Sequence, residues 1–305
     1  MLLLRCALFL LVGLTLGGCR RQPSPRETGA RHLAALREAR LLAGPRGATQ
    51  VLAVRMVSPR PTRWSADPAP FWWATLRNED GEAGYLVWKA DASQELLDFS
   101  LEGLVALETP AARVLDGVPP VQQFVVRGGD GQPVASGCVP TAGASLIAYW
   151  SNRGTFDWQA DDSHQGLTRR LRDRMPMVVL PDLEGYTDGA MALAGASTEA
   201  LVAALAEDAK DYKVRVTIAR TPFDFGALQR EIGLGQPVVL ICGVLVPRKP
   251  ELAWGHAVVA VGFAQVAGRP FVAVVDNFHV PRQPGTVRWI AAERCRELVF
   301  VRPVR

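Results

Sequence analysis

The chain has 305 residues, of which 49% are hydrophobic and 21% are charged. This composition excludes an intrinsically disordered protein and is sufficient for one large or two moderate folded domains. The formal net charge of +4 at pH 7 is too small to indicate nucleic acid as a partner.

The N-terminus has the pattern of a secretory signal. Its apolar run is too short to span a bilayer comfortably and ends in Leu16-Gly17-Gly18-Cys19. That ending resembles the lipobox of bacterial lipoproteins, which are cut before the cysteine and lipidated on it. Residues 1–18 are therefore predicted to be a lipoprotein signal peptide, with Cys19 as the lipid anchor and residues 19–30 as a tether. Ordinary secretion and a retained anchor are the alternatives.

Residues 31–118 are predicted to form a small α+β domain. Helix-forming residues dominate 28–42, and Gly44-Pro45 follows as a stop signal. Strand-like runs come next, separated by turn residues: 50–57, 71–76, 84–88 and 96–99. The pattern indicates a helix on a small antiparallel sheet, and Val118-Pro119-Pro120 is a plausible boundary.

Residues 119–305 read as a helical front followed by an antiparallel β back. The predicted helices cover 138–150, 197–210 and 225–234. The predicted strands cover 238–246, 257–264, 271–276, 286–290 and 297–301. The fold class is therefore α+β.

Cys138 is a candidate nucleophile because it stands at the predicted start of a helix. Helix N-termini carry partial positive charge and free N–H groups, which stabilise a thiolate. Gln132, six residues upstream, could donate a hydrogen bond to a developing oxyanion. The alternative is that Cys138 is a small buried hydrophobe.

His256 is the histidine best placed to activate Cys138. It opens an apolar strand, whereas His32, His164 and His279 fall on a helix and in loops. Asp276 ends the next apolar run, and in an antiparallel hairpin the end of one strand lies beside the start of the other. Asp276 is therefore predicted to orient the imidazole, with Asn277 as the alternative. The alternative is that His256 is a structural histidine whose hydrogen bonds are satisfied within the fold.

The other cysteines suggest no metal or redox site. Cys242 lies in an apolar run and is expected to be an inert core thiol, and a disulfide between Cys242 and Cys295 is the alternative. No pair has the C-x-x-C spacing of zinc or dithiol sites, so no metal and no cofactor are expected.

Two families of cysteine peptidases are similar to this chain over about residues 119–305. Gly131-Gln132-x-x-Ala135-x-Gly137-Cys138-Val139-x-Thr141-Ala142 resembles the active-site segment of the streptopain family. Gly255-His256-Ala257-Val258-Val259 resembles the peptidases that process double-glycine leaders. The run Asp276-Asn277-Phe278-His279 departs from the Asn-Trp-Gly-Trp type run of the streptopain family.

The resemblance implies a papain-like fold and a peptide or protein substrate. It assigns Cys138 as nucleophile, His256 as base, Asp276 as orienting residue and Gln132 as oxyanion donor. Residues 31–118 faintly resemble the streptopain pro-region, which implies intramolecular inhibition or help in folding; an unrelated accessory domain is the alternative. The expected protein is thus an extracytoplasmic, membrane-anchored cysteine peptidase of the periplasmic face or cell surface. A cell-wall amidase or transpeptidase on the same fold, and a peptide-binding domain without activity, are the rival functions.

Overall fold

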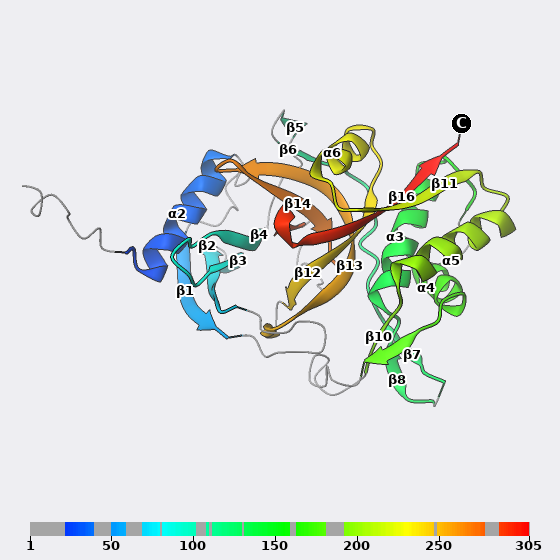
Figure 1. The fold of residues 1–305 in the computed structure, drawn as a ribbon, viewed down its shortest axis with the longest axis horizontal. Coiled ribbons are helices and arrows are strands. Elements are labelled where there is room, and N and C mark those ends of the chain that lie inside the picture. The colour runs from blue at the N-terminus through cyan, green and yellow to red at the C-terminus, as the bar shows by residue number, and fades with distance from the viewer. Residues whose placement is uncertain are drawn as a thin grey trace, which may run out of the picture.

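The computed structural model describes residues 22–39, 50–58, 69–79, 81–101, 108–109, 112–129, 131–158, 163–180, 192–246, 249–277 and 287–304. The predicted α+β class is confirmed, because these residues form helices and a large antiparallel sheet (Figure 1). The predicted signal peptide and Cys19 lie outside the described residues. No helix in the described part of the chain has the length and apolar composition needed to cross a membrane.

The first helix, α2, spans Pro25–Glu38 and begins earlier than predicted. Ser24 accepts a hydrogen bond from the Glu27 N–H, and the Glu27 side chain accepts one from the Ser24 N–H. This capping box, with Pro25 in the first turn, explains why part of the expected tether is helical. The buried side chains of Leu33 and Leu36 join α2 to the sheet beside it.

An antiparallel meander follows α2. Its strands are β1 (Gln50–Val57), β2 (Phe71–Asn78), β3 (Gly81–Lys89) and β4 (Leu96–Leu101). They overlap the four predicted strand runs. The meander then continues, through β4, into the strands of the C-terminal part.

One sheet therefore crosses the boundary placed near Pro119. Beyond β4 its order is β15 (Arg288–Ala291), β14 (Arg269–Val275), β13 (Lys249–Val266), β12 (Val238–Val246), β16 (Cys295–Pro303) and β11 (Val216–Pro222). At the junction Trp289 is opposite Phe99, and their rings stack with centroids 5.8 Å apart. The short strands β5 (Glu108–Thr109) and β6 (Ala112–Val114) pair with each other, and β6 also pairs with β13.

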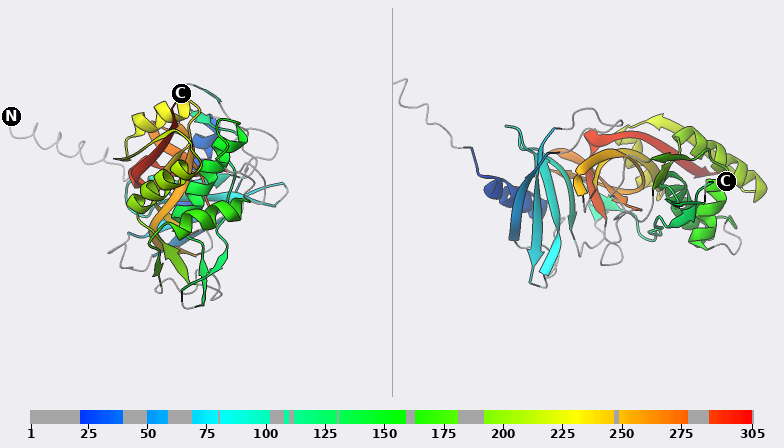
Figure 2. Two further views of the ribbon diagram at one scale, coloured as in Figure 1. Left: turned by 90° about the vertical axis from the view of Figure 1, so that its right-hand side faces the viewer. Right: turned by 90° about the horizontal axis from the view of Figure 1, so that it is seen from below.

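Helices α3 (Cys138–Asn152), α4 (His164–Asp173) and α5 (Thr198–Asp211) form the helical front. Gly143 allows close packing here, because a Cβ on it would lie 2.8 Å from Leu171 and 3.0 Å from Leu201. Helix α6 (Phe225–Gly233) packs near β12 and β13. Figure 2 shows α2 at one end of the elongated molecule and α3–α5 at the other, with the sheet between them.

Two small hairpins lie beside the start of α3. Strands β7 (Val125–Arg127) and β8 (Pro133–Ala135) form one, and β9 (Val178–Leu180) and β10 (Leu193–Gly195) form the other. A bridge between Val134 and Ala192 joins the hairpins. They surround the chain segment that leads into Cys138.

Candidate active site

Cys138 is the first residue of α3 and is 6% exposed. The preceding Gly137 has a φ of 99°, and a Cβ there would lie 2.7 Å from the Met177 methyl group. Only glycine meets both conditions, so Gly137 makes the turn that brings the thiol to the helix start. The first N–H groups of a helix have no intrahelical partner and favour negative charge.

The approach to Cys138 is held by side chains from elsewhere in the fold. The Arg172 guanidinium on α4 donates to the carbonyl oxygens of Ala135, at 3.2 Å, and Ser136, at 2.8 Å. The Thr141 hydroxyl donates to the Gly137 carbonyl at 2.6 Å. These contacts fix the backbone on both sides of the thiol.

His256 lies on β13 and is 1% exposed. Its Nε2 is 3.0 Å from Oδ1 of Asp276, which immediately follows β14. Val259 is opposite Val275, so Asp276 is diagonal to His256 and lies on the same face of the sheet. The predicted contact between the two side chains is therefore present.

Asn277, the alternative orienting residue of the sequence analysis, hydrogen-bonds to two backbone carbonyl groups in the structure. Its Nδ2 donates to the Cys138 carbonyl at 3.1 Å and to the Ala257 carbonyl at 2.9 Å. The amide thus joins the start of α3 to the strand that carries His256. Its own Oδ1 accepts from Nε2 of Gln123 at 2.8 Å.

The two central groups change each other's pKa. Burial by itself raises the pKa of the Cys138 thiol. Hydrogen bonding to His256, the charge of that ring and the N–H groups of Ala257 and Val139 together lower this pKa by more, so that the net shift is a decrease. Burial by itself lowers the pKa of His256, but Asp276 and Cys138 raise it to about 9. The arrangement favours a thiolate beside an imidazolium. Since Nε2 contacts Asp276, Nδ1 is the ring nitrogen left for the thiol.

Gln132 lies farther from this cluster than the sequence suggested. It is exposed, at the β7–β8 turn, and four steps of extended chain through β8 put roughly 13 Å between its Cα and that of Ser136. Gln123 instead contacts Asn277, and its Oε1 is buried without a hydrogen-bond partner among the described residues. No motif pointed to Gln123, and its position three residues after Pro119-Pro120 was the one available signal.

Of the remaining cysteines, Cys242 is opposite His256 on β12, and its thiol donates to the His256 carbonyl oxygen at 3.7 Å. Cys242 and Cys295 are cross-strand neighbours, but both are buried free thiols, and burial raises the pKa of Cys295 to about 12. His164 begins α4, and burial lowers the pKa of His32, a residue of α2, to about 4. His279 lies outside the described residues.

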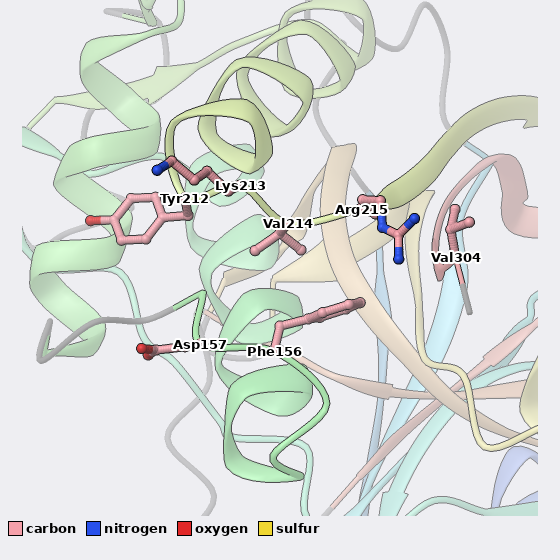
Figure 3. Close-up of a pocket in the computed structure, with 7 residues that line it drawn as sticks. All are labelled: Phe156, Asp157, Tyr212, Lys213, Val214, Arg215 and Val304. Atoms are coloured by element: carbon pink, nitrogen blue, oxygen red, sulfur yellow. The ribbon is translucent and has the colours of Figure 1, made fainter.

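The described residues contain no group of three or more His, Cys, Asp or Glu side chains that could hold a metal ion. A pocket lies beyond the opposite end of α3, lined by Phe156, Tyr212, Lys213 and Arg215 among others (Figure 3). The 15 residues of α3 separate it from Cys138 by about 20 Å. This pocket is therefore separate from the cluster around the thiol.

The chain matches no protein-family model and no curated protein. Its function has to be inferred from the side chains gathered at Cys138.

Proposed function

We propose that the protein is a papain-like cysteine peptidase. One observation carries the proposal: a thiol at a helix start, an imidazole on β13 and a carboxylate after β14 come together in a buried row. The lowered pKa of Cys138 and the raised pKa of His256 suit an activated nucleophile and a proton donor.

The proposed reaction is acyl transfer to the thiol followed by hydrolysis. The Cys138 thiolate attacks the peptide carbonyl carbon, and the His256 imidazolium gives its proton to the leaving amine as the C–N bond breaks. Water then attacks the thioester carbon while His256 takes a proton from it, the C–S bond breaks to return the Cys138 thiolate, and the carboxylic acid leaves. Asp276 holds the ring and stabilises its charged form throughout.

The oxyanion formed in each step needs hydrogen-bond donors. The Cys138 N–H at the start of α3 is one candidate. For the second donor, the position of Gln123 favours it over Gln132, because Gln123 already hydrogen-bonds to Asn277 beside Cys138. One hydrogen of its amide binds Asn277, and the second is available to a substrate oxygen.

A thiol-directed epoxysuccinyl probe tests the Cys–His pairing. Labelling of the wild-type protein should be lost in Cys138→Ala and strongly reduced in His256→Ala. His164→Ala is the matched control, since that histidine lies at the exposed start of α4, and its labelling should equal the wild type. Full labelling of His256→Ala would overturn the pairing.

Two substrates separate the peptidase from a cell-wall enzyme. The wild-type protein should hydrolyse casein, and Cys138→Ala should not. Cleavage of muropeptides without any cleavage of casein would replace the peptidase by an amidase. Labelling without cleavage of either substrate would favour a binding protein.

We also propose that the peptidase is a lipid-anchored, extracytoplasmic protein. The support is the lipobox-like Leu16-Gly17-Gly18-Cys19 of the sequence. A clickable fatty acid should label the wild-type chain in a bacterial host and should not label Cys19→Ala. Equal labelling of both proteins would exclude Cys19 as the anchor.

A further inference from the structure

The carboxylate of Asp276 has a second partner, Arg288 on β15. One carboxylate oxygen, Oδ1, faces His256, and the other, Oδ2, accepts from Nη1 of Arg288 at 2.8 Å. Arg288 is only 4% exposed. A buried guanidinium needs a compensating charge, and Asp276 also serves the imidazole.

The compensating charge comes from the N-terminal meander. Asp98 on β4 is completely buried, and both of its oxygens lie 3.1 Å from Nε of Arg288. Nη2 of Arg288 also donates to Asp98, which makes the pair bidentate. The Tyr85 hydroxyl on β3 donates to Asp98 at 3.2 Å.

We infer that Arg288 and Asp98 are positioning residues for the Asp276–His256 pair, so that the N-terminal meander completes the active site of the proposed peptidase. The inference rests on the proposed function in so far as it concerns catalysis. It gives residues 31–118 a role different from the inhibition that the sequence suggested.

Strand register makes this contact a fixed property of the fold. Arg288 is opposite Ser100 and Ile290 is opposite Asp98, so Arg288 and Asp98 are diagonal neighbours on one face of the sheet. A rigid bidentate fork on one side leaves the remaining guanidinium nitrogen in one orientation. That nitrogen fixes the plane of the Asp276 carboxylate, and the carboxylate fixes the ring.

The charges alternate along the row, which explains why both residues are needed. From the thiolate outward the signs are negative for Cys138, positive for His256, negative for Asp276, positive for Arg288 and negative for Asp98. Without Asp98, the unbalanced Arg288 cation would weaken the hold of Asp276 on the imidazolium proton. Without Arg288, two carboxylates would attract that proton.

Other ionisable groups on the elements around His256 are few in the described part of the chain. Cys242 on β12 has its pKa raised by burial, and Arg294 of the short 3-10 helix η2 (Ala292–Arg294) donates to the Gly243 carbonyl. Arg113 on β6 donates to the Gly233 carbonyl, and Glu231 on α6 pairs with Arg302. These groups have partners of their own, so Asp276, Cys138 and the Arg288–Asp98 pair dominate the field at the ring.

The pH dependence of Cys138 alkylation by iodoacetamide measures this field without requiring hydrolysis. The full-length protein should show an acidic step from the thiol and an alkaline step from His256. The alkaline step should move down by at least half a pH unit in Asp98→Asn and up in Arg288→Gln. Shifts of opposite sign are not expected if the two residues only stabilise the fold.

Kinetics and controls complete the test. Peptide hydrolysis by Asp98→Asn should show kcat lowered about tenfold with KM nearly unchanged, as expected for a misaligned base. Glu95→Gln is the matched control, because Glu95 forms a partly exposed pair with Lys89 in the same β3–β4 hairpin and should leave both measurements unchanged. An Asp98→Asn protein identical to Glu95→Gln in both measurements would overturn the inference.

The double variant Asp98→Asn/Arg288→Gln decides the matter if a single variant does not fold, because it has no unpaired charge at the junction. Its alkaline step should return towards that of the wild type while kcat stays low, and a wild-type kcat would overturn positioning. If no protein hydrolyses peptides, the wild type included, the proposed function fails, and the alkylation profiles still test the Arg288–Asp98 contact.

Discussion

At the residue scale, the proposed chemistry depends on which groups of the site carry protons. The Cys138 thiol has a lowered pKa, while that of His256 is raised to about 9. The lowered pKa of the thiol and the raised pKa of the imidazole open a pH range in which the ion pair exists. The thiol loses its proton on the acidic side of this range, and the imidazolium loses its proton on the alkaline side.

We therefore predict a bell-shaped pH profile for peptide hydrolysis. The rate should rise below the ordinary pKa range of a cysteine thiol, because Cys138 ionises early. It should fall as the pH passes about 9, because His256 then lacks the proton needed by the leaving amine. Measurement of kcat/KM from pH 4 to pH 11 tests this, and a single rise centred near the unperturbed thiol value of 9.0 would contradict it.

Asn277 provides a second test at this scale. Its amide joins the carbonyl groups of Cys138 and Ala257, so Asn277→Ala leaves two buried acceptors without that donor. We expect a loss of about 1–3 kcal/mol in unfolding free energy. We also expect kcat to fall roughly 10- to 100-fold, because small displacements of the reacting groups are costly.

Urea denaturation and steady-state kinetics measure the two effects of Asn277→Ala. Ser93→Ala is a suitable control, because its hydroxyl donates to Asp91 in an exposed turn. Wild-type kcat in Asn277→Ala would show that the bridge between α3 and β13 does not position the thiol and the imidazole.

Sequence reasoning found the contact between His256 and Asp276 because strand alternation and a hairpin define near neighbours. It could not find Asp98 and Arg288 as a pair, because 190 residues separate them. A signal was nevertheless present. Each is a charged residue inside an otherwise apolar strand run, and such a residue is rarely buried without a partner.

At the element scale, the turn into α3 controls where the thiol lies. The φ of 99° at Gly137 is one that residues with a Cβ rarely adopt, and a Cβ there would lie 2.7 Å from the Met177 methyl group and 3.2 Å from the Ala194 carbonyl oxygen. We predict that Gly137→Ala lowers the unfolding free energy by about 1–3 kcal/mol through backbone strain alone. It should also reduce probe labelling of Cys138, because the start of α3 has to shift.

Gly154→Ala separates strain from crowding in this test. Gly154 has a φ of 64°, but no heavy atom would lie within 4 Å of an added Cβ. That variant should be destabilised less than Gly137→Ala and should keep wild-type labelling. Equal destabilisation of the two variants in urea, with labelling retained, would show that the turn at Gly137 tolerates a side chain.

Elements with strong local signals were predicted closely, and weakly patterned ones were missed. The predicted strand at 238–246 matches β12, and the predicted helix at 138–150 is two residues shorter than α3. Strand β11, whose side chains alternate between exposed and half-buried, was not predicted because it carries little apolar periodicity. The hairpin strands β7–β10 have only three residues each, too few for a period to be visible.

At the scale of the whole molecule, the sequence suggested two parts and the sheet joins them. Pro119-Pro120 reads as a linker because prolines interrupt local structure. The pairing of β4 with β15 is invisible to such reasoning, because it links segments nearly 190 residues apart whose register depends on the complete fold. Phe99, fully buried, packs across this junction against Trp289 and Phe271.

The shared sheet predicts that both parts unfold together. Phe99→Ala should cost about 3–5 kcal/mol, because it removes a fully buried ring at the junction. Since one core connects α2, the meander and α3, urea should unfold all of them in a single transition. Tryptophan fluorescence follows the whole chain, and alkylation of Cys138 follows the site alone.

Val57→Ala makes the test specific to the coupling. Val57 is buried on the edge strand β1, in a separate apolar cluster with Phe71, Trp73, Tyr85 and Val87, and β2 and β3 lie between it and β4. If the sheet transmits stability, this smaller truncation should move the fluorescence and alkylation midpoints to lower urea by the same amount. A fluorescence midpoint that falls while the alkylation midpoint stays at its wild-type value would show that the meander unfolds separately. The meander could then be removed without disturbing the site, as a removable pro-region requires. A meander that holds Arg288 through Asp98 does not allow this.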